Sequence, residues 1–112
     1  MVKVGLTMGQ KKMMRMMRMM RMTNREIVAE YNEDAVVFTE DWYDDAIIAV
    51  TTEGNAVYDY EKLAEILMKH DKMTWEDAVE WIEYNMIRGA AYMGQYRPFV
   101  AYTMKSMRED YE

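Results

Sequence analysis

The alternation of apolar and polar residues becomes regular at Thr23 and divides the rest of the chain into short elements. Thr23 is followed three residues later by Glu26, and two apolar residues, Ile27 and Val28, come next. This is a capping-box pattern at the start of a helix. We therefore expect a short helix over residues 24–31, which a run of polar residues ends.

Three apolar runs that are typical of strands follow this helix. Residues 35–38 (AVVF) are apolar and β-branched, and residues 46–50 (AIIAV) form an unbroken apolar run that implies burial. Residues 56–60 (AVYDY) are the return strand after a turn at 51–55 (TTEGN), where Gly and Asn tolerate the positive φ of a tight hairpin. The acidic segment 40–45 (EDWYDD) is expected to be a loop.

Two consecutive helices are predicted next. Asp59 is a candidate N-cap for the first helix, which ends near Asp71. The second begins at Thr74, whose capping partner Asp77 comes three residues later, and runs to about Arg88. Its apolar stripe at i, i+3 and i+4 spacing consists of Trp75, Ala78, Val79, Ile82 and Met86.

The C-terminal part is less regular. Gly89 and Gly94 bracket a looser turn, and Pro98 starts a last apolar run that suits an edge strand, because proline lacks the ladder donor. The charged tail after Lys105 is expected to fray. Together these elements predict an α+β fold, in which a small sheet of three to four mostly antiparallel strands packs against two consecutive helices, with a short N-terminal helix in front.

Residues 1–21 do not follow this pattern. Residues 11–22 read KKMMRMMRMMRM, a three-residue repeat of low complexity. A step of three residues turns an α-helix by about 300°, so the basic positions drift around the helix instead of forming one stripe. The segment also lacks the uninterrupted apolar region and the cleavage site of a secretory signal. We expect a disordered or loosely helical basic extension, followed by a single domain over residues 22–112.

Charge divides the chain at the same place. Residues 1–21 hold six of the fourteen Lys and Arg and no acidic residue. Residues 22–112 hold the other eight against all twenty Asp and Glu, which is a formal charge of −12, whereas the whole chain has −6. A negative field of this kind accelerates encounter with a cationic partner. We expect the acidic domain to bind a basic protein and not to bind nucleic acid directly.

Residues suited to catalysis are scarce. The chain has no Cys, and it has one His, His70, and one Ser, Ser106, so it offers no pattern for a thiolate nucleophile or a Ser-His-Asp triad. Neither glycine-rich phosphate-binding motif occurs, and the acidic clusters do not have the spacing of a calcium loop. No apolar run reaches the roughly 20 residues of a membrane-spanning helix. We expect a protein that is not an enzyme, with no cofactor, no metal and no membrane contact.

Aromatic residues lie next to acidic residues in two segments, the predicted loop 40–45 and the second of the two consecutive helices. Tyr and Trp are enriched in protein interfaces, although Tyr58 and Trp75 fit core positions better. Like charges at i and i+4 on the helix repel each other, which indicates that another demand keeps them there. The candidate protein-binding residues are Trp42, Tyr43, Asp44, Asp45, Glu76, Glu80, Trp81, Glu83 and Tyr84.

From about Asp44 to Tyr102 the chain resembles a family of short, mostly uncharacterised proteins encoded by bacteriophages and prophages. The most distinctive segment of the resemblance is EDAVEWIEYNM at residues 76–86. The resemblance implies a viral accessory protein in the cytoplasm of the host cell. Its basic partner would be a host or viral protein, such as a nucleic-acid-binding defence enzyme that is inhibited by imitation of phosphate charge. The alternatives are a small assembly module that homodimerises and a protein tethered to nucleic acid by its basic N-terminal arm.

Overall fold

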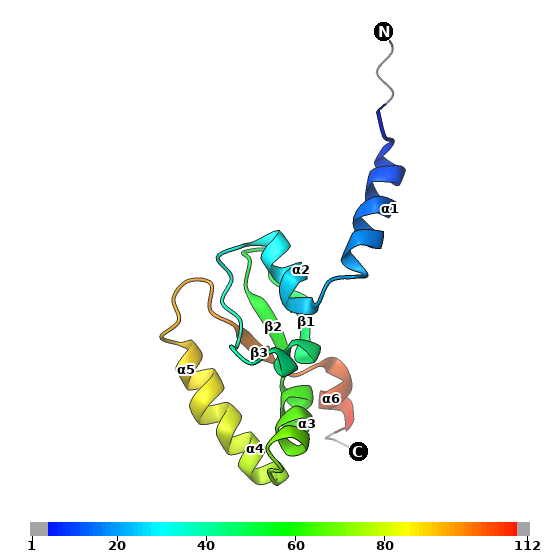
Figure 1. Cartoon of the computed structure of the whole chain (residues 1–112). Coiled ribbons are helices and arrows are strands. Elements are labelled where there is room, and N and C mark those ends of the chain that lie inside the picture. The colour runs from blue at the N-terminus through cyan, green and yellow to red at the C-terminus, as the bar shows by residue number, and fades with distance from the viewer. Residues whose placement is uncertain (1–4, 110–112) are drawn as a thin grey trace.

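The computed structural model describes residues 5–109 and has an α+β architecture with six α-helices and a three-stranded mixed sheet (Figure 1). Two further helical segments are not α-helical, since η1 is a 3₁₀ helix and η2 is a π-helix. The elements in chain order are α1 (Met8–Met19), α2 (Asn24–Tyr31), η1 (Asp41–Ala46), β1 (Ile47–Val50), β2 (Ala56–Asp59), α3 (Tyr60–His70), α4 (Trp75–Trp81), η2 (Ile82–Ile87), α5 (Arg88–Ala90), β3 (Phe99–Ala101) and α6 (Met104–Glu109).

The sheet has the strand order β1-β2-β3, and its two pairings run in different directions. β1 and β2 form an antiparallel hairpin in which Ile47 lies opposite Tyr58, and β2 pairs in parallel with β3, where Tyr58 lies opposite Val100. The prediction of a mostly antiparallel sheet is therefore wrong. Between β2 and β3 the chain passes through α3 and the helix that follows, and such a crossover brings the next strand back in the same direction.

The predicted strand at residues 35–38 is also wrong, because this segment pairs with none of the three strands of the sheet. The segment is extended but unpaired, and its amides find other acceptors. The amide of Phe38 donates to the hydroxyl of Tyr58 at 3.0 Å, and the amide of Val36 donates to the carbonyl of Tyr96 at 3.0 Å. The run is apolar because it covers the core, where the ring centroid of Phe38 lies 4.6 Å from that of Tyr58.

The helix starts follow the capping patterns of the sequence. Thr23 caps α2 and forms the predicted box with Glu26, whose pKa is lowered by hydrogen bonds from the amide and the hydroxyl of Thr23. Asp59 caps α3 by accepting from two amides of its first turn, and Thr74 caps α4. In the predicted hairpin turn, Gly54 has a φ of +100°. These local predictions are confirmed.

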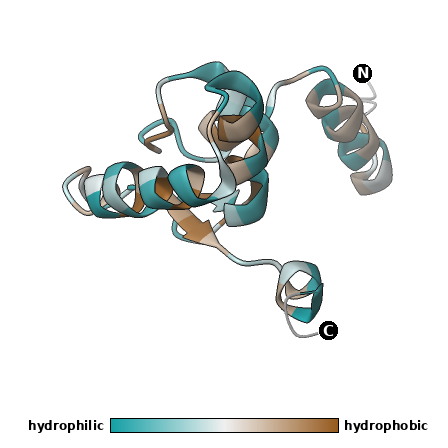
Figure 2. Ribbon diagram, turned by 90° about the horizontal axis from the view of Figure 1, so that it is seen from below, coloured by the Kyte–Doolittle hydropathy of each residue, from teal (hydrophilic) through white to brown (hydrophobic). Residues whose placement is uncertain are grey.

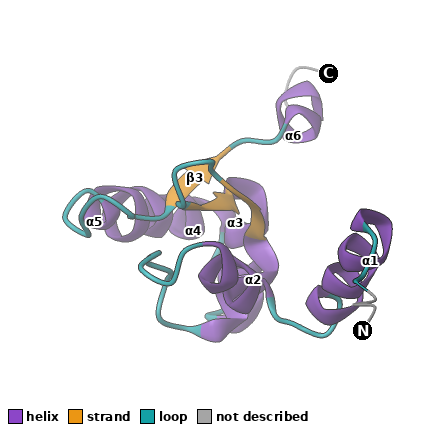
Figure 3. Cartoon of the chain, turned by 90° about the horizontal axis from the view of Figure 1, so that it is seen from above, coloured by secondary structure: helices purple, strands orange, loops and turns teal. Residues whose placement is uncertain are grey.

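The segments α4, η2 and α5 form one continuous helix over residues 75–90, which runs along one side of the molecule (Figures 1 and 3). It extends two residues beyond the predicted end at Arg88 and changes to π-helical geometry in its middle. Ala78, Ile82 and Met86 are buried along its inner stripe, and α4 and η2 pack against α3. The predicted apolar stripe of this helix is thus its core-facing side.

The core lies where the sheet, α3 and this long helix meet, and in Figure 2 the strongest brown lies on the strands at the centre of the molecule. The side chains of Tyr58, Leu63, Leu67 and Ile82 are fully buried there. The core position of Tyr58 is confirmed. Trp75 is 44% exposed, so its assignment to the core is wrong, because it is the first residue of α4 and lies at the outer end of the helix.

The described part of the N-terminal extension contains the regular helix α1, where the sequence predicted a disordered or loosely helical segment. Thr7 and Gln10 form a capping box at its start. In Figure 1 this helix stands apart from the rest of the chain, and an ion pair of 2.6 Å between Arg18 and Glu30 connects the two. Residues 1–4 of the extension lie outside the described residues.

The C-terminal tail is more ordered than the sequence predicts. Residues 104–109 form α6, and Ser106 is buried, with its hydroxyl donating to the carboxylate of Glu61 at the start of α3. The prediction of a frayed tail is therefore wrong for these residues. The charged composition of this segment did not predict the helix, because the hydrogen bond that holds it joins Ser106 to Glu61, a residue far away in the chain.

Candidate functional site

The acidic segment 40–45 is divided between the core and the surface. Residues 41–46 form the 3₁₀ helix η1, where a loop was predicted over residues 40–45. Trp42 is 40% exposed and stacks on the imidazole of His70 with ring centroids 4.9 Å apart, and Asp45 is exposed. Tyr43 is 5% and Asp44 7% exposed. Asp44 is too buried for its predicted role as a contact residue, whereas Tyr43 lines a groove beside Trp81.

Asp44 instead forms an ion pair inside the domain. Its two carboxylate oxygens accept from Nε of Arg25 at 2.9 and 2.8 Å, and this hydrogen bonding raises the pKa of Arg25 above its ordinary value. The guanidinium also donates to the carbonyl of Phe38 at 2.9 Å. Arg25 thus ties α2 to η1 and to the unpaired segment at residues 35–38, which is a structural role.

The candidate residues of the long helix point in different directions. Glu83 accepts from the hydroxyl of Tyr60 at 3.0 Å, and the pKa of Tyr60 is raised by burial and by this carboxylate. Residues two positions apart on a helix lie about 200° apart, so Trp81 and Glu83 are on opposite flanks. Tyr84 is exposed and lies under the guanidinium of Arg88, 4.4 Å from its ring centroid. The predicted residues therefore do not form one continuous surface.

One of them, Trp81, lines an open groove with a volume of about 370 Å³. One wall of the groove is the unpaired extended segment, and the other is the long helix. We call it the Trp81 groove. Its lining consists of residues 36–40, Tyr43, Trp81, Asn85, Met86 and Met93. The volume is at the lower end of the range for small-molecule pockets, which suits one or two side chains of a partner.

The floor of the Trp81 groove is apolar, whereas its surroundings are acidic. Glu40 lies in the wall, and in the described part of the chain no Lys or Arg lines the groove. Burial raises the pKa of Tyr43, and the carboxylates of Asp71 and Glu40 add to this shift. Asp77 lies one helical turn before Trp81 on the same side. We call Glu40, Asp71 and Asp77 the acidic rim, and all three are exposed.

The helical wall of the groove is the π-helical segment η2, which supplies Asn85 and Met86. Stretches of π-helix are rare and occur often at functional sites. Sequence reasoning missed the segment 36–40, because only the tertiary structure brings it beside Trp81. Asn85 was also missed, although it lies one helical turn after Trp81 and the helical spacing would have placed it there. The apolar run at 35–38 was a usable signal, but its composition is equally typical of a paired strand.

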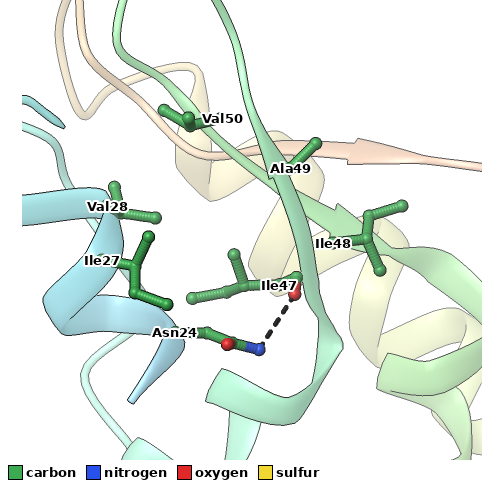
Figure 4. Close-up of a pocket in the computed structure, with 7 residues that line it drawn as sticks. All are labelled: Asn24, Ile27, Val28, Ile47, Ile48, Ala49 and Val50. Atoms are coloured by element: carbon green, nitrogen blue, oxygen red, sulfur yellow. Dashed lines mark hydrogen bonds between the residues drawn. The ribbon is translucent and has the colours of Figure 1, made fainter. Parts of the chain in front are cut away.

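A second hollow of about 280 Å³ lies between α2 and β1 (Figure 4). It is lined mainly by apolar side chains of these two elements, among them Ile27, Val28 and Ile47. Its one amide side chain, Asn24, already donates to the carbonyls of Asp44 and Ile47, both at 3.1 Å. β1 is an edge strand, so the physical role of α2 here is to cover its open edge.

The residues considered for catalysis lie apart. His70 is the last residue of α3, whereas Glu61, whose carboxylate accepts from Ser106, lies in the first turn of the same helix. His70 and Glu61 are therefore about 13 Å apart along the helix axis. Within residues 5–109, no three His, Asp or Glu side chains converge closely enough to hold a metal ion. Among the helices described, none combines the length and the apolar character needed to cross a membrane.

The chain matches no protein-family model, and no curated protein or solved structure is significantly similar to it.

Proposed function

We propose that this protein is a non-catalytic binding protein whose Trp81 groove takes a basic amphipathic helix of a partner protein. The observation that carries the proposal is the combination at one place of an apolar groove, a half-exposed Trp and a rim of carboxylates. Trp is the residue type most enriched among the hot spots of protein interfaces.

Shape and charge favour the same kind of partner. A helix that binds in a groove inserts apolar side chains at i, i+3 and i+4 spacing, and the Trp81 groove offers Met86 and Met93 as adaptable contacts for them. Cationic residues beside that apolar stripe would meet the acidic rim. Because the charge of residues 22–112 is −12, the long-range field also steers a cationic partner toward this domain.

The resemblance to phage and prophage proteins supports a biological setting for such binding. In this setting the protein is an accessory factor in the host cytoplasm, and its partner is a basic host or viral protein. A nucleic-acid-binding defence enzyme fits the charge, because a cationic surface built for phosphate would accept a carboxylate-rich surface in its place. The alternative of tethering to nucleic acid by α1 is supported by the four basic residues of that helix.

The direct test uses a designed helical peptide of Lys and Leu with one apolar stripe as the probe, and calorimetry with the full chain as the measurement. We expect saturable binding that weakens by more than tenfold between about 0.05 and 0.5 M salt. Trp81→Ala should abolish it. The matched control is Trp75→Ala, since Trp75 is on the same helix and is 44% exposed against 42% for Trp81, but does not line the groove.

Two further comparisons separate the groove from simple charge attraction. Glu40→Lys on the wall should weaken binding of the peptide, whereas Glu53→Lys in the hairpin turn should leave it nearly unchanged. A peptide of the same composition with its apolar stripe scrambled should bind at least tenfold more weakly. Equal binding of both peptides, or equal effects of Trp81→Ala and Trp75→Ala, would overturn the proposal.

A further inference from the structure

The helix α1 is more amphipathic than the three-residue repeat of the sequence suggests. The helix ends at Met19, before the repeat has drifted far around its axis. Its four basic residues, Lys11, Lys12, Arg15 and Arg18, fall within an arc of about 120°. The methionines at positions 13, 16, 17 and 20 occupy largely the opposite side. α1 is therefore a basic helix with one apolar face, which is the class of ligand proposed for the Trp81 groove.

Much of this apolar face is open to solvent. Met13, Met16, Met17 and Met20 are all more than half exposed, and every residue of α1 is exposed except Met19, which is half-buried. Toward the body, Met16, Met19 and Met20 line an open hollow of about 480 Å³ together with Ile27 of α2, and Arg18 forms the exposed ion pair with Glu30. Met13 and Met17 do not line this hollow, so they are available to another surface.

We infer that α1 of one molecule docks in the Trp81 groove of a second copy, with its methionines in the groove and Lys12, the basic residue nearest to them around the helix, toward the acidic rim. This inference rests on the proposed function, because it names a ligand for the same groove. The match is one of charge and of surface, since α1 carries four cationic and no acidic residues, and the body beyond residue 21 has a charge of −12.

The geometry favours a neighbouring molecule over the same one. In Figures 1 and 3, α1 and the long helix lie at opposite ends of the molecule, and the long helix forms one wall of the groove. The connection between α1 and α2, residues 20–23, spans at most about 14 Å. Charge also distinguishes the occupants, because the acidic body that attracts a second α1 repels an anionic bilayer or a nucleic acid held against α1.

A contact of this kind joins two different surfaces, so it does not close on itself. A pair of molecules keeps one free α1 and one free groove, which generates open chains rather than a two-fold dimer. The expected behaviour of the full-length protein is thus an average mass that rises with concentration past that of a dimer. Because the attraction is partly electrostatic, the mass should fall back toward that of a monomer in high salt.

The test uses two variants, each of which disables one of the two contact surfaces. Trp81→Ala disables the groove and leaves α1 unchanged. The triple variant Lys11→Glu, Lys12→Glu, Arg15→Glu removes the positive charge of α1 and leaves the groove unchanged. Arg18 is left intact because it pairs with Glu30. Analytical ultracentrifugation from about 10 µM to 1 mM covers the range of weak association. Each variant alone should be a monomer, whereas an equimolar mixture should form a complex of two molecules that does not grow further.

Methionine variants of α1 test whether its apolar face makes the contact. Met13→Ser with Met17→Ser should weaken self-association by at least tenfold, whereas Met8→Ser, on the basic side of α1, should have little effect. A wild-type chain that stays monomeric at low salt, or a mixture that fails to pair, overturns this inference. The Lys/Leu peptide distinguishes failure of this inference from failure of the proposed function. If the peptide binds wild-type protein but self-association is absent, the groove is a binding site and α1 is not its ligand. Retention of α1 on anionic vesicles or duplex DNA in preference to a second copy also overturns the inference.

Discussion

Replacing Asp44 by Asn tests whether the acidic segment of η1 serves folding or binding. Asp44 and its neighbour Asp45 are both acidic candidates from the sequence, but Asp44 is 7% exposed and paired with Arg25, whereas Asp45 is exposed. The substitution keeps the size of the side chain and removes its charge. Arg25, whose side chain is 28% exposed, then loses the partner that compensates its burial.

The size of the effect follows from the degree of burial. Removing one partner of a fully buried ion pair costs about 3–5 kcal/mol, and an exposed pair contributes about 0–1 kcal/mol. The Arg25–Asp44 pair lies between these limits but closer to the buried one, with side chains 28% and 10% exposed. We therefore expect Asp44→Asn to lower the free energy of unfolding by about 2 kcal/mol, and the melting temperature by on the order of 10 °C.

Urea denaturation followed by circular dichroism measures this difference, with Asp45→Asn as the matched control. Asp45→Asn should change the free energy of unfolding by less than about 0.5 kcal/mol. The folded fraction of Asp44→Asn should still bind the Lys/Leu peptide as the wild type does. If the two variants are equally stable, or if Asp44→Asn loses peptide binding without losing stability, the structural role assigned to Asp44 is refuted.

Two further predictions concern single buried or strained positions. Burial raises the pKa of Tyr58 to about 12, so the folded state holds this proton more tightly than the unfolded state, and Tyr58 should contribute a loss of stability of about 1.4 kcal/mol per pH unit from pH 10 to pH 12, beside the losses from Tyr43 and Tyr60, whose pKa values are also raised. Tyr58→Phe should remove this contribution from the alkaline slope of denaturation curves, even though it leaves the amide of Phe38 without its acceptor and lowers stability at pH 7; an unchanged slope would assign the whole effect to other groups. Gly54→Ala places a Cβ 2.5 Å from Nδ2 of Asn32 at a φ of +100° and should cost about 3 kcal/mol in thermal melts, whereas Gly94→Ala, at +89° with open space around it, should cost only about 1 kcal/mol. Equal costs at the two glycines would show that the contact with Asn32 is unimportant.

The sequence by itself determined the elements whose signals are local. The capping residues Thr23, Asp59 and Thr74 marked three helix starts, because a side chain that accepts from an amide two or three residues ahead acts within one turn. The apolar runs at 46–50 and 56–60 with a glycine turn between them identified the hairpin for the same reason. The division of charge at residue 21 also required only the order of the residues.

Tertiary structure decided everything that depends on which segments become neighbours. It placed Asp44 against Arg25 and Glu83 against Tyr60, so two predicted surface acids are held by internal contacts. It also left residues 35–38 outside the three-stranded sheet, where they form part of a wall beside Trp81. Pairing and burial depend on contacts between residues far apart in the chain, and composition and periodicity do not say which distant segments meet. The Trp81 groove is therefore a product of the fold, although the residue that dominates it was visible in the sequence.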